Sequence, residues 1–341
     1  MKSVMVTGPG TTAVVKVPEP AVGPADVLVR IRACGICGSD GMYIAVGGIP
    51  PRQGATPLGH EPAGEVAVVG AAVTGLAVGD HVVLNPMAAS DGIIGSGGAQ
   101  GALADYVLIK DAEVGRHLIT IPAHVPFEVA TLNEPMAVAT HAVNRLEPRA
   151  GQTAVVFGAG PIGLGAAIGL KLRGVAHVVV VDVVPNRLEK ALEVGADAVI
   201  NSAEEDVAQR LRDLHGDAVR HFSRGGAGTD LYLDAAGVPA VLETIFATAK
   251  HGARVSIVAV HKKPVAVDFG ALLTSEITIA LAMGYPTEIF EVTQDLIENW
   301  ERYALIISDI VPFAEVDRAL SLAGTPGAAD KVVVTFGEED L

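Results

Sequence analysis

Short runs of apolar, β-branched residues alternate with helix-like stretches between about residues 151 and 284. The strand-like runs include TAVVF, AHVVVVD, DAVI, TDLYLDAAG, ARVSIVAV and ITIALAMG, and helix-like stretches such as VPNRLEKALEVG separate them. This alternation is typical of a parallel sheet covered by helices on both faces, because such strands are buried on both sides. Six strands of this kind predict a complete doubly wound α/β fold of the dinucleotide-binding, or Rossmann, type.

A glycine-rich turn follows the first of these strands and opens the first helix. Gly158, Gly160 and Gly163 form the pattern G-x-G-x-x-G, with Pro161 and Ile162 between the last two glycines. The first glycine permits the tight turn, the second lets the backbone approach a pyrophosphate, and the third allows close packing of helix on strand. The free N–H groups of the helix N-terminus then face the phosphates, so we expect a dinucleotide here. The alternative is a glycine-rich turn that binds no ligand.

An acidic residue, Asp182, ends the second strand of this half. A carboxylate at this position is expected to accept hydrogen bonds from the adenosine ribose hydroxyls and to repel a 2′-phosphate. Asp182 therefore predicts NAD rather than NADP. Arg187 lies five residues further on and weakens this prediction, because an arginine can accommodate the 2′-phosphate.

The first half of the chain has a different pattern, with short β-type runs such as DVLVRIRA and GEVAVVG divided by glycine and proline. This spacing predicts a compact, mostly β domain over residues 1–144. The predicted Rossmann domain covers residues 145–287. The tail, residues 288–341, contains two helix-like stretches and one closing strand that have no place in a six-stranded sheet, so we assign it to the first domain.

Composition narrows the class of partner. The chain of 341 residues is 50% hydrophobic and 18% charged, and 24 basic against 39 acidic residues give a net charge of −15. This charge argues against a nucleic-acid partner and favours a small-molecule ligand. The mean hydropathy is +0.43, but the longest uncharged run, residues 150–170, contains the glycine-rich turn, which argues against a membrane span. The N-terminus lacks a signal-like apolar segment, and two cysteines fit a reducing compartment, so we expect a cytoplasmic protein.

The two cysteines, Cys34 and Cys37, stand three positions apart in ACGICGSDGMY. A redox pair needs its first cysteine at a helix N-terminus, and the glycines on both sides of Cys37 predict a poor helix start. A structural zinc site needs four ligands, usually with a second cysteine pair that this chain does not have. The third interpretation is a catalytic metal site that uses one thiolate and other ligands from elsewhere.

Candidate ligands of that kind follow in LGHEPAGEV, where His60 and Glu61 are adjacent in an apolar segment. A second acidic residue, Glu134, stands in the apolar stretch LNEPMAVATHAV. Cysteine, histidine and a carboxylate make three protein ligands and leave one position open, which is the arrangement of catalytic zinc. From the residues alone, hydrogen-bonded core side chains remain an equal alternative.

Taken together, CGICGSD, GHEPAGEVAVVG, LNEPMAVATHAV and VVFGAGPIGLGAAIGLK resemble the zinc-dependent medium-chain alcohol and polyol dehydrogenases, and within them the butanediol and sorbitol dehydrogenase branch. The resemblance covers nearly the whole chain. It implies that the β-rich half is a GroES-like catalytic domain, that Cys37 and His60 are ligands of a catalytic zinc, and that Glu61 and Glu134 are the acids that bind or exchange at the metal. Cys34 matches a position that is not a ligand. The further cofactor positions implied by the resemblance are Ala236, Val258 and Val260.

The resemblance also implies a reaction: zinc acts as a Lewis acid on an alcohol, and hydride passes reversibly to NAD to give a ketone. Ser39 matches the hydroxyl that first receives the alcohol proton, although a serine here could also cap a turn. The family commonly has a histidine three residues after this serine, where this chain has Met42. The onward proton path must then use the cofactor ribose, Tyr43, His141 or water.

A second departure lies between GDHVVLNP and ALADYVLI. The family normally has a lobe with four cysteines and a structural zinc there, whereas this chain has the short segment MAASDGIIGSGGAQG. We therefore expect one catalytic zinc per chain and no structural zinc. Separately from this segment, the resemblance implies a homodimer or homotetramer. Two other functions remain open, namely a zinc-free NADPH-dependent quinone or enone reductase and a non-catalytic NAD-binding redox sensor.

Overall fold

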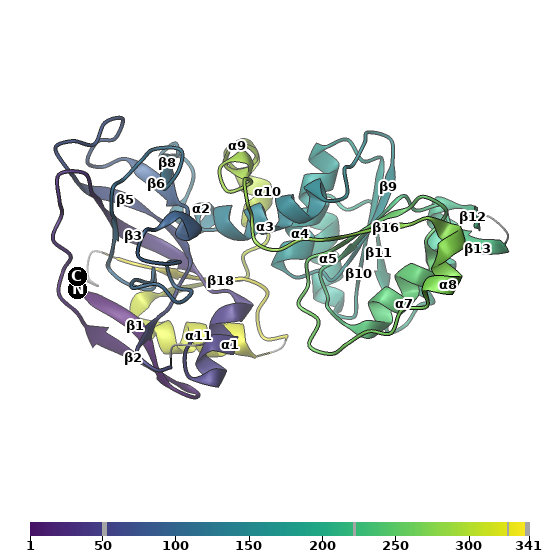
Figure 1. Cartoon of the computed structure of the whole chain (residues 1–341), viewed down its shortest axis with the longest axis horizontal. Helices are drawn as coiled ribbons and strands as arrows, with labels where there is room; N and C mark the ends of the chain where they lie inside the picture. The colour runs from purple at the N-terminus through teal and green to yellow at the C-terminus, as the bar shows by residue number, and fades with distance from the viewer. Residues whose placement is uncertain (50–52, 221–222, 326, 338–341) are drawn as a thin grey trace. The chain divides into compact units, whose positions relative to one another are not determined.

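The structure is a computed structural model that describes residues 1–49, 53–220, 223–325 and 327–337. The chain forms two compact units (Figure 1): one contains residues 1–134 and 289–341, and the other residues 135–288. Helix α3 (Asn133–Asn144) begins at the end of the first segment and continues into the second unit. No helix in the described ranges has the length and apolarity that a bilayer crossing requires.

The first unit is mostly β-structure. One sheet has the order β2-β1-β4, and a seven-stranded sheet has the order β17-β18-β3-β5-β6-β8 with β7 paired to β3. The strands are β1 (Lys2–Gly8), β2 (Thr11–Lys16), β3 (Val27–Gly35), β4 (Thr56–Pro57), β5 (Glu61–Val69), β6 (His81–Leu84), β7 (Tyr106–Ile109), β8 (Leu118–Thr120), β17 (Asp309–Pro312) and β18 (Val332–Thr335). The tail strands β17 and β18 thus extend the sheet of the first half.

Short helices complete this unit. They are α1 (Gly38–Val46), η1 (Pro86–Ala88), α2 (Phe127–Ala130), α9 (Glu291–Glu298), α10 (Trp300–Ala304), η3 (Phe313–Glu315) and α11 (Val316–Gly324). The segment TEIFEVTQDLIENW contains α9 and the start of α10, which begins directly after Asn299. A buried apolar cluster that includes residues of β1, β3, β5 and β18 forms the core.

The second unit is a doubly wound fold. Its six parallel strands have the order β11-β10-β9-β14-β15-β16, in which the direction of winding reverses between β9 and β14. The strands are β9 (Thr153–Phe157), β10 (His177–Asp182), β11 (Ala198–Asn201), β14 (Leu231–Asp234), β15 (Arg254–Ile257) and β16 (Thr278–Leu281). Residues 154–157 and 178–181 are buried, as expected for strands covered on both faces. The six-stranded prediction is confirmed.

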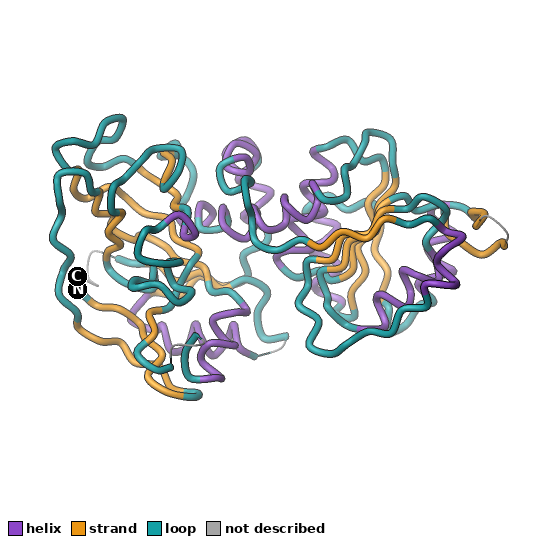
Figure 2. Tube along the Cα trace, viewed as in Figure 1, coloured by secondary structure: helices purple, strands orange, loops and turns teal. Residues whose placement is uncertain are grey.

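Helices lie on both sides of this sheet (Figure 2). They are α4 (Pro161–Leu172), α5 (Pro185–Glu193), α6 (Val207–His215), α7 (Pro239–Thr248), α8 (Phe269–Leu272) and η2 (Leu273–Ser275). An antiparallel hairpin, β12 (Asp217–Arg220) and β13 (Ser223–Ala227), was not predicted from the sequence. Helix α6 begins at Val207, because the side chain of Asp206 caps it by accepting a hydrogen bond from the Gln209 N–H at 3.0 Å.

Candidate metal centre and cofactor site

Strand pairing brings the candidate metal ligands together. In the antiparallel register of β3 and β5, Gly35 lies opposite Glu61. Cys37 follows Gly35 by two residues and His60 precedes Glu61 by one, so both flank the same end of the paired strands. One ligand atom from each of Cys37, His60 and Glu61 lies within 4.8 Å of the others. Sulfur, imidazole nitrogen and carboxylate oxygen are the donor types that zinc prefers.

Close backbone packing fixes the segment that carries the histidine. Gly59 has a φ of +91°, and a Cβ at this position would collide with the backbone of Leu103. The segments on the two sides are tied by hydrogen bonds from Ala102 N to Gly59 O (2.8 Å) and from Leu103 N to Leu58 O (2.9 Å). Because only glycine combines this φ with this contact, the entry into His60 is held in one position.

Helix α1 begins directly after Cys37, so the expectation of a poor helix start was wrong. The Asp40 carboxylate accepts a hydrogen bond from the Cys37 backbone N–H at 2.9 Å, which satisfies a donor at the helix N-terminus. This capping offsets the low helix propensity of the flanking glycines. The redox interpretation still gains no support, because the Cys34 thiol lies fully buried in β3, burial raises its pKa, and both cysteines are free.

The imidazole of His60 lies between two polar side chains. Its Nε2 is 3.3 Å from the Ser39 hydroxyl oxygen, and its Nδ1 is 3.4 Å from Asp40 Oδ1. Asp40 is fully buried. Burial alone would lower the pKa of His60, but the charge of Asp40, together with contacts from Asp40 and Cys37, outweighs it and holds that pKa well above its usual range.

A buried lysine completes the surroundings of Glu61. The Lys331 ammonium group forms an ion pair with Glu61 Oε2 and donates a hydrogen bond to the Ile36 carbonyl oxygen at 3.1 Å. Burial opposes the charged form of Lys331, yet the Glu61 carboxylate more than compensates and raises the lysine pKa. Neither Lys331 nor Asp40 was predicted from the sequence as part of the site. The sequence does hold one signal that could have found the lysine, namely that this charged residue stands directly before the apolar strand VVVTF.

The centre fits a cation. Within the described part of the chain, Glu61 Oε1 and Asp40 Oδ1 are buried without a hydrogen-bond partner, and so is His60 Nδ1. Leaving buried acceptors unsatisfied is costly. A zinc ion beside the Cys37 sulfur would satisfy Glu61 Oε1, and the charges of thiolate and carboxylate match its double positive charge.

Glu134, the other predicted acid, is buried in the first turn of α3. It is not part of the group of atoms within 4.8 Å of one another. Its charge nevertheless contributes to the raised pKa of Lys331, which places Glu134 in the same buried environment. The structure therefore brings Cys37, His60 and Glu61 together and leaves Glu134 outside that group.

The two candidate proton-path residues, Tyr43 and His141, and the departing residue Met42 have different surroundings. The side chain of Met42 is 54% exposed, whereas Tyr43 packs against the core of the first unit. His141 belongs to the second unit, where its Nδ1 lies 2.9 Å from Glu288 Oε1. The paired His141 therefore has a structural contact of its own.

The glycine-rich turn adopts the geometry expected from its pattern. Gly158 has a φ of +99°, and a Cβ at Gly163 would collide with the Gly158 carbonyl oxygen. Above Gly160 a Cβ would meet nothing within 4 Å, so this side of the turn is open. Helix α4 begins at Pro161 with Gly160 as its N-cap, which leaves backbone N–H groups of its first turn facing the same opening. The turn has room for a phosphate group.

Asp182 lies at the carboxyl end of β10, next to this turn. Its Oδ2 accepts a hydrogen bond from Ala159 N at 2.7 Å, and its Oδ1 accepts from Val183 N (2.7 Å) and Val184 N (3.0 Å). The carboxylate thus organises the turn itself. Arg187 lies in the first turn of α5, and the remaining candidate positions Ala236, Val258 and Val260 follow the ends of β14 and β15.

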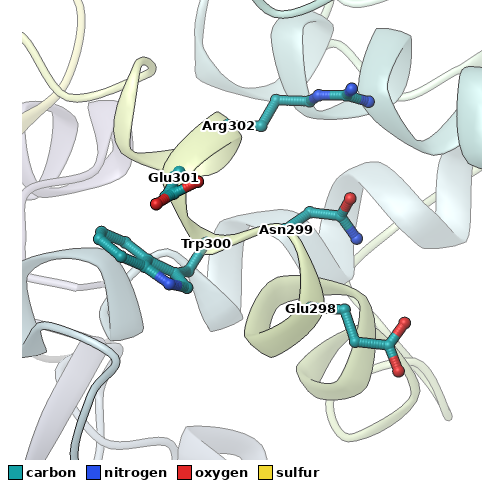
Figure 3. Close-up of a pocket in the computed structure, with 5 residues that line it drawn as sticks. All are labelled: Glu298, Asn299, Trp300, Glu301 and Arg302. Carbon is teal, nitrogen blue, oxygen red and sulfur yellow. The ribbon is translucent and has the colours of Figure 1, made fainter.

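A separate hollow lies at the junction of α9 and α10 (Figure 3). Its lining consists of residues Glu298, Asn299, Trp300, Glu301 and Arg302. None of the candidate metal or cofactor residues lines it.

Two family models match the chain: the alcohol dehydrogenase GroES-like domain over residues 23–122 and the zinc-binding dehydrogenase model over residues 161–299. The (R,R)-butanediol dehydrogenase of Bacillus subtilis (strain 168) is 31% identical over 303 residues, which cover 82% of this chain and 83% of the relative. The chain belongs to the zinc-type medium-chain alcohol and polyol dehydrogenases.

Two further relatives agree with this family. The sorbitol dehydrogenase of the same Bacillus subtilis strain is 32% identical over 259 residues, covering 71% of this chain and 70% of the relative. A crystal structure of 2R,3R-butanediol dehydrogenase from Bacillus subtilis superimposes with a TM-score of 0.86 at 26% identity, covering 98% of this chain and 99% of that one. Membership of this dehydrogenase family makes the protein an oxidoreductase of the alcohol and polyol class, and the family implies zinc and a nicotinamide cofactor.

Proposed function

We propose that the protein catalyses the reversible, zinc-dependent and NAD-linked oxidation of a secondary alcohol, diol or polyol to a ketone. The observation that carries this proposal is that ligand atoms of Cys37, His60 and Glu61 lie within 4.8 Å of one another. Among the described residues, the buried Glu61 Oε1 has no hydrogen-bond partner. The named relatives act on butanediol and sorbitol, which supports a substrate with a secondary hydroxyl group.

In this proposal one zinc per chain binds Cys37, His60 and Glu61. Asp40 faces His60 Nδ1, which leaves Nε2 as the nitrogen directed to the metal. Glu61 has one oxygen in the ion pair with Lys331 and offers the other, Oε1. Glu134 lies outside the cluster and would act by exchange or through water. With only two cysteines, the chain offers no four-thiolate structural site.

Bound zinc would supply a Lewis acid that polarises the oxygen of the alcohol. The Ser39 hydroxyl lies 3.3 Å from His60 Nε2, beside the proposed zinc ligands, and would receive the alcohol proton. Asp40 contacts the Nδ1 side of the His60 ring and Ser39 its Nε2 side. The imidazole therefore stays oriented while the proton moves. The exposed Met42 cannot carry that proton further.

The second unit would bind the cofactor. NAD would supply the hydride acceptor, with its pyrophosphate at residues 158–163 and its adenosine ribose beside Asp182. The carboxylate of Asp182 favours NAD over NADP by repelling a 2′-phosphate. Because Asp182 also holds three backbone N–H groups, the same charge would shape the turn and select the cofactor.

We further propose that two copies of the chain associate through β16. This strand ends the six-stranded sheet, so one of its edges has no partner strand among the described residues. Leu281 is 70% exposed, and the nearby Met283 is 86% exposed. An open, apolar strand edge favours pairing with the same edge of a second copy. A cytoplasmic location remains a prediction from composition.

The zinc-free reductase is the alternative function, and one experiment separates the two. Protein purified without chelators should contain about one zinc per chain and reduce NAD with diols or secondary alcohols. Cys37→Ala should lose both the metal and the activity, while Cys34→Ala, the matched control, should keep its zinc. Wild-type protein without zinc that reduces quinones with NADPH would contradict the proposal. A protein with zinc that oxidises no alcohol in a broad panel would favour the redox sensor.

A further inference from the structure

Asp234 ends β14 at the point where the winding of the sheet reverses. β14 lies between β9, which leads into the glycine-rich turn, and β15. In open parallel sheets the ligand binds outside the carboxyl ends of the strands at this point. The Asp234 side chain is nevertheless completely buried, so it does not itself face a ligand.

The contacts of Asp234 tie together the loops that follow β14 and β15. Its Oδ1 accepts hydrogen bonds from the backbone N–H groups of Ala236 and Gly237, both at 2.9 Å. Its own carbonyl oxygen accepts hydrogen bonds from Val258 N at 3.0 Å and Ala259 N at 3.1 Å. One residue thus fixes the turn after β14 and the first two residues after β15.

His261 extends this network to the end of the second loop. Its Nε2 lies 2.7 Å from Asp234 Oδ2, and its side chain is 16% exposed. The other ring nitrogen, Nδ1, is buried and has no hydrogen-bond partner among the described residues. Because a carboxylate oxygen accepts, the Nε2–H of His261 donates this hydrogen bond to Asp234 Oδ2.

The loops that this pair holds touch one another and the glycine-rich turn. A Cβ built on Gly237 would lie 2.9 Å from the Val260 carbonyl oxygen, and one on Gly158 would lie 3.1 Å from the Ala235 carbonyl group. The backbone at the ends of β9, β14 and β15 is therefore in direct contact. The Val260 side chain, 78% exposed, projects from this surface.

We propose that Asp234 and His261 are positioning residues that hold the backbone at residues 235–237 and 258–260 in the shape that receives the nicotinamide half of the cofactor. This inference rests on the proposed NAD-linked function. Asp182 and residues 158–163 serve the adenosine and phosphate half, on the other side of the point where the winding reverses. Loss of the His261 contact should therefore weaken binding of the nicotinamide half alone.

The test compares NADH with ADP, which lacks the nicotinamide and its ribose, as titrants of the zinc-loaded protein. His261→Leu removes the hydrogen bond and should raise the Kd for NADH about tenfold, the usual effect of losing one such bond. The Kd for ADP should stay within about twofold. His261→Gln can donate an N–H to Asp234 and should restore most of the NADH affinity. The control is His251→Leu, at a half-exposed histidine whose Nε2 lies 3.9 Å from Glu276 Oε2.

Two outcomes would overturn this inference while the proposed function stands: unchanged NADH affinity in His261→Leu, or an equal loss of NADH and ADP affinity. A positioning role also predicts an increased KM for NAD with a smaller change in kcat. If the wild-type protein binds neither NADH nor ADP, the cofactor assignment itself fails, and this inference fails with it.

Discussion

The ammonium group of Lys331, on the residue before β18, forms a buried ion pair with Glu61 at the start of β5. The two residues are 270 positions apart in sequence. Their side chains are 3% and 1% exposed, respectively. The lysine therefore neutralises a candidate metal ligand from a part of the chain that contributes no other candidate ligand.

Lys331→Met should destabilise the metal-free protein by about 3 kcal/mol, because it leaves the Glu61 carboxylate buried without a counter-charge. Zinc would supply that charge, so the loss should shrink when the metal is bound. Lys331→Arg keeps the charge and serves as the control. Thermal unfolding with and without zinc measures the difference, and an equal loss in both states would contradict the role we assign to Lys331.

Ser39→Ala should lower kcat by about a hundredfold, because it removes the hydroxyl that we propose receives the alcohol proton. Zinc content should not change, since Ser39 is not one of the three proposed ligands. Ser321→Ala, at an exposed serine of α11, is the matched control. Steady-state kinetics and metal analysis of both variants test this, and a kcat close to wild type in Ser39→Ala would argue for a purely structural serine.

Asp182→Asn should narrow the preference for NAD over NADP by about tenfold, since it removes the charge that repels the 2′-phosphate. The amide keeps one oxygen for the backbone N–H groups of the turn. Asp197→Asn makes the same charge change before β11, at the opposite end of the strands. The ratio of kcat/KM for the two cofactors is the measurement, and an unchanged ratio in Asp182→Asn would show that another group selects the cofactor.

Leu281→Lys should shift the protein from dimer to monomer, because a charge would be buried in the proposed interface at β16. Ile310→Lys is the control, at a 54% exposed residue of β17, which is also an edge strand. Light scattering during size-exclusion chromatography gives the masses. A wild-type monomer, or a Leu281→Lys dimer of undiminished stability, would rule out this interface.

A pH-dependent loss of stability should arise at His215. Its Nε2 lies 2.9 Å from His177 Nδ1, and its Nδ1 lies 2.7 Å from the Thr229 hydroxyl oxygen. Burial, and then the neighbouring His177, lower the pKa of His215 from 6.5 to about 4. Between these values the unfolded chain binds the proton more strongly than the folded chain, so stability falls as the pH drops from about 6.5 to 4.

His215→Gln should flatten that part of the stability profile, because its amide does not titrate. Melting temperatures recorded from pH 7.5 to pH 4 would measure this. The melting temperature should fall more steeply with decreasing pH in the parent protein than in the variant. Parallel plots of melting temperature against pH would contradict the assignment to His215.

Much of the fold could be predicted from the sequence, because periodicity and glycine patterns are local signals. The order of apolar runs predicted the six-stranded sheet, and Gly158, Gly160 and Gly163 predicted the turn that follows β9. The hairpin β12–β13 was missed because the segment SRGGA has neither the alternation nor the β-branched residues of an ordinary strand.

The candidate site was predicted only in part, because several of its contacts are non-local. Cys37, His60 and Glu61 stand in recognisable motifs, whereas Lys331 reaches Glu61 through the pairing of β18 with β3. The helix after Cys37 was missed because a side-chain cap from Asp40 outweighs the unfavourable glycines. His261 and Asp234 meet through the order of strands in space, which no spacing along the chain reveals.

The contact between Gly59 and the backbone at residues 102 and 103 also limits how this enzyme could be rebuilt. A Cβ on Gly95 would collide with the Gly59 carbonyl group, and one on Gly101 would collide with Leu58. The short loop of residues 87–101 and the segment before His60 therefore share one tightly fitted boundary. A designer who grafts a longer, cysteine-bearing lobe into this loop would have to redesign residues 58–60 at the same time, or displace the candidate metal ligand His60.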